Sequence, residues 1–267
     1  MSLLSPSTTA ALVSNSIKHN YLKANPFPHV IIDDFLESSL ASQIATEFPS
    51  YESQFLDEYS NQIEEKKLLN HWNKFGPSTY STLSFLCSQR FSDILTDFTS
   101  SKALNADIGL HGAGIHMHSR GGKNNVHLDY SIHPKLGLQR KLNLIIYLTP
   151  DWDPSWNGSL GLYKGDKTQP TELVKEIIPK FNRAILFDVT GLSWHGLPDP
   201  ITCPSSISRN SLALFYLQEP DQTADKKRVK ATFSPAPWQI DDPEVLRTIQ
   251  MRSNLGSASS IYLQDKV

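Results

Sequence analysis

Residues 183–197 read RAILFDVTGLSWHGL and contain two short apolar runs, Arg183–Val189 and Ser193–Leu197. Similar runs continue back to residue 109 and forward to residue 218, so this part of the chain holds eight candidate strands. Strands this short and this evenly spaced favour a sandwich or barrel over a βαβ sheet. The other six are Gly109–His118, Val126–His133, Lys141–Leu148, Ser159–Tyr163, Glu172–Ile178 and Arg209–Gln218.

The flanking segments have a different pattern. Residues 26–35 form a β-branched run that predicts a strand, and apolar residues recur at spacing four over residues 40–48, which is typical of an amphipathic helix. Two further helices are predicted over residues 83–98 and 244–251. The first hundred residues are therefore expected to mix helix and strand.

The composition fits a folded protein with a substantial core. The chain has 267 residues, of which 39% are hydrophobic and 19% charged. We expect one structural domain overall, in which an N-terminal support at residues 1–105 is integrated with a jelly-roll core at residues 106–235. Residues 236–267 are expected to add a C-terminal helix and tail.

The charge balance and the targeting signals indicate which binding partners and which cellular compartment to expect. The formal net charge of -2 provides no polycationic surface, so we expect no nucleic-acid partner. The longest apolar stretches, such as 142–148, are shorter than the roughly 20 residues of a membrane span. Residues 1–16 lack the pattern of a secretory signal, and Cys87 and Cys203 lack CxxC spacing. We therefore expect a cytoplasmic protein without a membrane partner.

The strongest candidate site involves His127, Asp129 and His195. The first two stand at i and i+2 in one predicted strand, so their side chains point to the same face. This tripeptide alone is weak evidence, but His195 lies on a second predicted strand that a sandwich could bring beside the first. Two imidazoles and one carboxylate are the ligands of a mononuclear non-haem Fe(II) oxygenase.

Arg209 opens the last predicted strand, and Ser211 lies on the same side of it. Because the strand that follows is apolar, an inward Arg209 would be a buried charge that needs an anionic partner. A ligand carboxylate suits the fork of the guanidinium. A protein carboxylate or an ordinary ion pair at the rim is the alternative.

The order of these motifs resembles that of the Fe(II)- and 2-oxoglutarate-dependent dioxygenases, in particular their prolyl-4-hydroxylase-like branch. The resemblance covers most of residues 26–218. The matching stretches are PFPHVIIDDFL at 26–36, HLD at 127–129, NLIIYLTPDW at 143–152, NGSL at 157–160, FNR at 181–183, SWHG at 193–196 and RNS at 209–211.

The resemblance implies a double-stranded β-helix, or jelly roll, in a mainly β protein. It implies that His127, Asp129 and His195 ligate Fe(II), and that Arg209 binds the distal carboxylate of 2-oxoglutarate with help from Tyr147 and Ser211. It further implies O2 as a co-substrate and allows ascorbate as an auxiliary reductant. The implied activity is hydroxylation of an unactivated C–H bond in a peptidyl or free amino acid, with a prolyl residue as the first candidate.

Rival functions stay open at this point. A non-catalytic or zinc-bound jelly-roll module could use Arg209 to bind an acidic ligand. The nucleic-acid demethylase branch is disfavoured by the near-neutral charge, and a halogenase is disfavoured because Asp129 is present. The sequence predicts neither the primary substrate nor the oligomeric state.

Several other residues invite a functional interpretation. His111, His116 and His118 could form a second metal cluster, although a pocket wall or a surface strand explains them better. Met117 occupies the position where relatives often carry an aromatic co-substrate contact.

Two further hypotheses concern the substrate. The segment 119–140 is expected to shape the substrate entrance, with a basic mouth of Arg120, Lys123, His133, Lys135 and Arg140. A solvated loop whose charges are incidental is the alternative. The indole rings of Trp152, Trp156 and Trp194 could stack on substrate or pack in the core.

Overall fold

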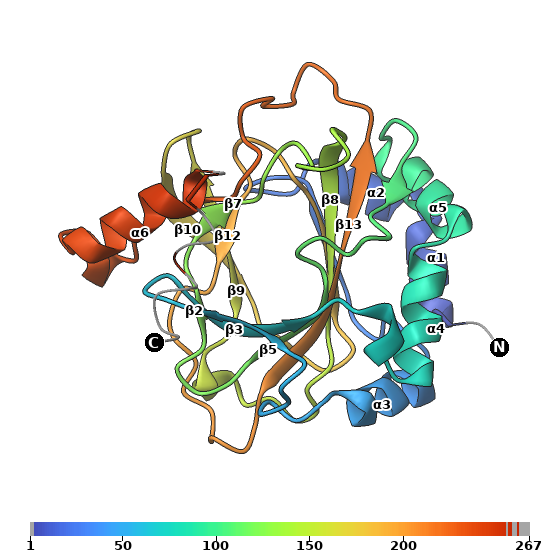
Figure 1. The fold of residues 1–267 in the computed structure, drawn as a ribbon. Helices are drawn as coiled ribbons and strands as arrows, with labels where there is room; N and C mark the ends of the chain where they lie inside the picture. Colours follow the sequence, from blue (N-terminus) through green and yellow to red (C-terminus); the bar gives the residue numbers. More distant parts are fainter. Residues whose placement is uncertain (1–2, 255, 258–260, 262–267) are drawn as a thin grey trace.

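Two antiparallel sheets and six α-helices make up the part of the chain that the structure describes, residues 3–254, 256–257 and 261 of a computed structural model (Figure 1). The helices are α1 (Pro6–Leu12), α2 (Asn15–Leu22), α3 (Ser38–Glu47), α4 (Pro77–Leu86), α5 (Gln89–Thr99) and α6 (Pro243–Ser253). The strands are β1 (His29–Ile32), β2 (Asp57–Ser60), β3 (Glu64–Leu69), β4 (Asn105–Ala106), β5 (Gly114–His118), β6 (Lys123–Asn124), β7 (His127–Leu128), β8 (Gln139–Tyr147), β9 (Leu160–Gly165), β10 (Pro170–Ile177), β11 (Ala184–Asp188), β12 (Trp194–Gly196), β13 (Arg209–Gln218) and β14 (Thr232–Phe233).

The two sheets face each other as in a jelly roll. The larger sheet has the order β1-β11-β8-β13-β5-β3-β2, with β4 attached to β13 and β6 attached to β3. The smaller sheet has the order β10-β9-β12-β7-β14. Helices α1 to α5 lie outside the larger sheet, and α6 lies on the other side of the molecule (Figure 1). The predicted mainly β jelly-roll fold is confirmed.

Side-chain alternation along the central strands separates the core from the interior of the jelly roll. On β8, Leu142, Leu144 and Ile146 pack in the main core with the helices, and on β13 Leu212 and Leu214 do the same. The intervening residues point between the two sheets. Strands β8 and β13 therefore present one apolar face to the helices and a second face to the site.

Strand β7 is much shorter than predicted. The predicted strand Val126–His133 is reduced to His127–Leu128, and the chain turns after Asp129. The backbone N–H of Ser131 donates to the Arg228 carbonyl at 2.7 Å, and that of His133 to the Leu138 carbonyl at 2.8 Å. These hydrogen bonds hold the segment as a folded loop, because they replace the ladder that a longer strand would need.

Two further differences from the sequence prediction concern the N-terminal part. The single helix expected over residues 83–98 is two helices, because the Ser88 hydroxyl accepts the Phe91 N–H at 3.3 Å and starts α5. The hairpin β2–β3 was not predicted. No helix among the described residues is long and apolar enough to cross a membrane.

Candidate functional site

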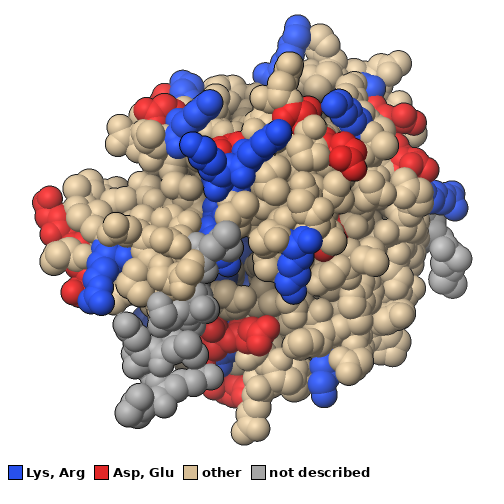
Figure 2. All heavy atoms as spheres, turned by 45° about the horizontal axis from the view of Figure 1, so that its top comes forward, with Lys and Arg blue, Asp and Glu red and all other residues tan. Residues whose placement is uncertain are grey.

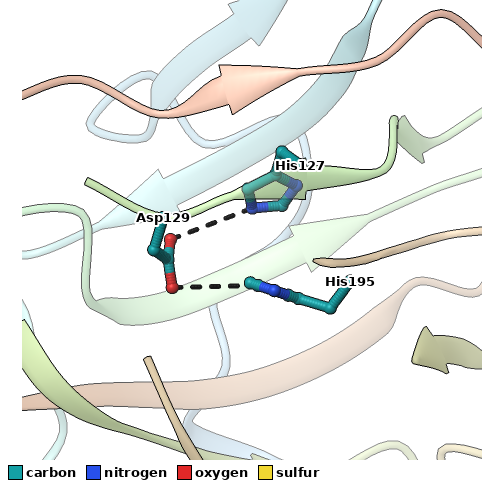
Figure 3. Close-up of side chains that lie close together, drawn as sticks. All are labelled: His127, Asp129 and His195. Atoms are coloured by element: carbon teal, nitrogen blue, oxygen red, sulfur yellow. Dashed lines mark ion pairs between the residues drawn. The ribbon is translucent and has the colours of Figure 1, made fainter. Parts of the chain in front are cut away.

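His127, Asp129 and His195 lie together between the sheets (Figure 3). His127 on β7 is the direct register partner of His195 on β12, and Asp129 follows β7. Nε2 of His127 lies 3.9 Å from Oδ1 of Asp129, and Nε2 of His195 lies 3.7 Å from Oδ2. One potential ligand atom from each of the three buried residues lies within 4.8 Å of the others. The structure therefore brings the three predicted residues together.

Backbone carbonyls orient both imidazoles. Nδ1 of His127 donates to the Asn125 carbonyl at 2.8 Å, and Nδ1 of His195 donates to the Ser193 carbonyl at 2.9 Å. A carbonyl only accepts, so the hydrogen is on Nδ1 and the Nε2 lone pair points toward Asp129. Burial, with His195 next in importance, lowers the pKa of His127 to about 3, so this ring is neutral, as a metal ligand must be.

Asp129 is held as a carboxylate by two donors. Nη1 of Arg140 lies 3.1 Å from Oδ1, and Nδ2 of Asn143 donates to Oδ2 at 3.2 Å. Burial by itself raises the pKa of Asp129, but the charge of Arg140 and the two nearby histidines outweigh it and lower the pKa to about 2. The site thus supplies an ionised oxygen ligand.

The expected basic mouth is wrong for two of its five residues. Arg140 is buried, with its guanidinium carbon 3.4 Å from the Tyr130 ring centroid and 3.3 Å from that of Phe215. His133 is also buried, 3.3 Å from a carboxylate oxygen of Asp107. The segment folds back on itself, so these two side chains point inward, whereas Arg120 and Lys135 are exposed and Lys123 is half-buried.

Arg209 on β13 is a buried cation that lines the interior of the jelly roll. It is 4% exposed, its Nε donates to the Gly158 carbonyl at 2.7 Å, and its guanidinium carbon lies 4.8 Å from the Tyr147 ring centroid. A Cβ at position 158 would lie 3.1 Å from Cδ of Arg209, so glycine permits this close approach. Within residues 3–254, 256–257 and 261, no acidic side chain neutralises Arg209. Ser211 and Tyr147 are buried beside it and face each other in register.

A single cavity of about 1230 Å³ connects the His-Asp-His cluster with Arg209 and Ser211. Its wall also includes His116 and His118 of β5, whereas Met117 points the other way into the core. The structure therefore places the two histidines, and not Met117, on the cavity wall. Alternation along Gly109–His118 contained this signal, because residues 116 and 118 share a face and residue 117 does not.

The tryptophans do not line this cavity. Trp152 packs with Leu197 and Ile201, and Trp156 lies against it. Trp194 is fully buried, and its Nε1 donates to the Asp166 carbonyl at 2.7 Å. Core packing accounts for all three rings.

Comparison with known proteins identifies the domain. Residues 113–217 match the family described as the 2OG-Fe(II) oxygenase superfamily, and this segment includes the His-Asp-His cluster and Arg209. The chain carries a 2OG-Fe(II) oxygenase domain. Such domains use Fe(II) and 2-oxoglutarate, for which the buried imidazoles, the ionised Asp129 and the buried guanidinium of Arg209 are chemically suited.

The relatives of this 2OG-Fe(II) oxygenase domain include prolyl hydroxylases. A segment of 78 residues is 36% identical to "Prolyl 3-hydroxylase OGFOD1" of Mus musculus, covering 29% of this chain and 14% of the mouse protein. The chain thus matches only a small part of that relative's length.

Solved structures share the fold. A Pseudomonas putida prolyl-4-hydroxylase superposes with a TM-score of 0.55 at 13% identity, covering 77% of this chain and 98% of that one. A Trichoplax adhaerens prolyl hydroxylase, bound to a hypoxia inducible factor peptide fragment, gives 0.54 at 19% identity, covering 78% and 90%. These likenesses confirm the double-stranded β-helix.

Proposed function

We propose that this protein is an Fe(II)- and 2-oxoglutarate-dependent dioxygenase that hydroxylates an unactivated C–H bond of a prolyl residue. One observation carries the proposal: a buried His-Asp-His cluster and a buried Arg209 without an acidic partner in the described residues line the same cavity. The first suits a divalent metal with open coordination positions, and the second suits a carboxylate ligand.

In this proposal His127, Asp129 and His195 would hold the iron. Bound there with 2-oxoglutarate and O2, the metal supplies the oxidising chemistry that places one oxygen atom on carbon. The protein's part is to fix the ligands. The Asn125 and Ser193 carbonyls keep Nε2 of each histidine available, and Arg140 keeps the carboxylate ionised and directed.

Arg209 would bind the distal carboxylate of 2-oxoglutarate. Its Nε is used by the Gly158 carbonyl, so the two terminal nitrogens remain for a forked contact with the carboxylate. Ser211 on β13 lines the cavity, its register partner Tyr147 on β8 is buried beside it, and both would add hydroxyl donors. Together these residues would set the direction in which the co-substrate enters the site.

A peptide is the substrate that the cavity and the relatives favour. The volume of about 1230 Å³ exceeds what a small dicarboxylate fills, since drug-sized ligands occupy pockets of about 300–1,000 Å³. The mouse relative is named a prolyl 3-hydroxylase, and the Trichoplax enzyme binds a peptide fragment. A free amino acid is the alternative substrate.

Nucleic acid is a poorer candidate. Figure 2 shows one face of the molecule on which basic and acidic side chains both occur and most of the surface is neither. A continuous basic surface, which dominates affinity for nucleic acid, is not visible on that face. We therefore infer a peptidyl or small-molecule partner.

Succinate formation tests the proposal. Wild-type protein supplied with Fe(II), 2-oxoglutarate and O2 should form succinate, and Asp129→Ala should form none above background. A protein that bound Zn(II) and 2-oxoglutarate tightly but formed no succinate with Fe(II) would instead be the non-catalytic binding module.

We also propose that residues 1–105, 106–235 and 236–267 act as one structural domain in the cytoplasm. Support for one domain comes from the core shared by the N-terminal helices and the larger sheet, and from the 3.0 Å contact between Arg252 on α6 and Glu64 on β3. Both cysteines, Cys87 and Cys203, are free, which fits a reducing compartment.

A further inference from the structure

Beyond Arg209, Tyr147 and Ser211, we propose that His118 is a further ligand of the co-substrate's distal carboxylate and helps the site select a dicarboxylate. This inference rests on the proposed function, because it assumes that 2-oxoglutarate occupies the cavity. It adds strand β5 to a carboxylate subsite that the sequence motifs placed only on β8 and β13.

Strand register places His118 beside the carboxylate subsite. Arg209 on β13 is the direct partner of His118 on β5, and Ser211 is the partner of His116. Ser211 is in turn the partner of Tyr147 on β8. In a cross-strand pair the two side chains stand on the same face of the sheet, about 5 Å apart at Cβ. His118 therefore flanks Arg209 inside the cavity.

The imidazole of His118 has hydrogen-bonding capacity that the described part of the protein does not use. The residue is 4% exposed, and neither Nδ1 nor Nε2 has a hydrogen-bond partner among the described residues. A buried polar group without a partner destabilises the folded protein. A ligand in the cavity that accepts a hydrogen bond would remove this cost.

The charges around His118 indicate which ligand fits. Arg209 on one side and Lys66 on the other are both cationic, and burial together with these charges keeps His118 neutral. A neutral imidazole still has one N–H to donate. Lys66 already contacts Glu64 at 3.1 Å and Asn124 at 3.3 Å, whereas both ring nitrogens of His118 are unused in the described part of the protein. An anionic acceptor matches this environment, and the distal carboxylate has a second oxygen to accept from His118 while Arg209 binds the first.

Binding of two keto acids tests the inference. The probes are 2-oxoglutarate and 2-oxopentanoate, which has a methyl group in place of the distal carboxylate. Their affinities are measured by calorimetry on the full chain loaded with Mn(II), without O2, so that no turnover occurs. His118→Leu should weaken 2-oxoglutarate binding about 10- to 100-fold, as expected for loss of a hydrogen bond to a charged group, and leave 2-oxopentanoate binding within about twofold.

Three further variants make the test specific. His118→Gln, which retains an N–H donor, should recover most of the affinity for 2-oxoglutarate. His118→Phe keeps a ring without a donor and should behave like His118→Leu, which covers the case in which the leucine variant does not fold. Met117→Leu is the matched control on the same strand, because its side chain faces the core, and it should leave both affinities unchanged.

The outcomes separate this inference from the proposed function. If the donor-free variants bound 2-oxoglutarate as tightly as wild type, or lost affinity for both keto acids equally, His118 would not be a ligand of the distal carboxylate. Wild-type protein that bound Mn(II) but no 2-oxoglutarate would overturn the proposed function, and the role of His118 with it.

Discussion

Nη1 of Arg140 lies 3.1 Å from Oδ1 of Asp129, and both side chains are buried. The guanidinium is packed between the rings of Tyr130 and Phe215, and its Nη2 donates to the His111 carbonyl at 3.2 Å. A cation held this firmly fixes the direction of the carboxylate before any metal binds. Arg140 is therefore a positioning residue for the candidate metal centre.

Replacing Arg140 should destabilise the metal-free protein more than the metal-loaded protein. Arg140→Met leaves Asp129 as a buried charge without its partner, which costs about 3–5 kcal/mol, whereas a bound divalent cation supplies an opposite charge. Urea unfolding in EDTA and in excess Mn(II) measures the loss of unfolding free energy in the metal-free and in the metal-loaded protein. Lys135→Gln, at an exposed position of the same segment, should change neither. Equal destabilisation of Arg140→Met in both conditions would show that Arg140 acts only through packing.

Removing a histidine of the cluster should strongly weaken metal binding with little cost to folding. His195→Ala takes away one of three ligands, so the affinity for Fe(II) or Mn(II) should fall by more than the roughly 10- to 100-fold typical of residues that only support a ligand. A metal titration measured by calorimetry gives this affinity. His71→Ala, at an exposed histidine outside the cavity, is the control and should bind metal like wild type. Unaltered metal affinity in His195→Ala would refute the assigned ligand set.

Arg209 should control the affinity for 2-oxoglutarate. Arg209→Ala removes the cation that pairs with the distal carboxylate, at a cost of about 2–5 kcal/mol, so KM for 2-oxoglutarate should rise by tens to thousands of fold. Arg209→Lys should recover only part, because an ammonium lacks the fork of a guanidinium. Steady-state succinate formation measures KM, and an unchanged value in the alanine variant would be incompatible with this role.

Glu47 should stabilise the protein in a pH-dependent way. Its carboxylate accepts the backbone N–H groups of Ser78 and Thr79 at 2.8 and 2.7 Å and caps α4. Burial raises the pKa of Glu47, but these hydrogen bonds outweigh it and hold the pKa below the ordinary value of 4.5. The ionised form therefore stabilises the folded state, fully above pH 4.5 and less as the pH falls further.

The variant Glu47→Gln should accordingly lose about 1 kcal/mol of stability at pH 7. The difference in unfolding free energy between this variant and wild type should disappear when urea unfolding is repeated at acid pH. Glu52→Gln is the control, because that carboxylate is 86% exposed. If this difference stayed constant from pH 7 to acid pH, the charge of Glu47 would contribute nothing to stability.

The central strands could be predicted from sequence because the side chains along them alternate regularly between two buried faces. Arg209–Gln218 has the bounds predicted for it, since one face of β13 packs against the helices and the other faces the interior. The convergence of His127 with His195 was also predictable once both strands were assigned. What the sequence does not contain is the register that pairs them.

The features that the sequence did not predict depend on contacts between residues that are far apart in the chain. The hairpin β2–β3 has the charged sequence DEYSNQIEEKKLL, which gives no apolar alternation, and it forms because β3 pairs with β5. Arg140 follows a polar loop and looks like a surface cation. Its burial against Asp129 depends on the turn after β7, which is fixed by hydrogen bonds to Arg228, about one hundred residues later.

Mass spectrometry of prolyl-containing peptides under turnover shows whether this protein is a prolyl hydroxylase. With Fe(II), 2-oxoglutarate and O2, wild-type protein should add one oxygen atom, a gain of about 16 Da, to a proline of its substrate peptide, with one succinate formed for each hydroxylation. His195→Ala should give neither product. Stoichiometric succinate with no oxygen added to any peptide or amino acid offered would contradict the prolyl assignment, and the absence of both products from metal-loaded wild type would contradict the account as a whole.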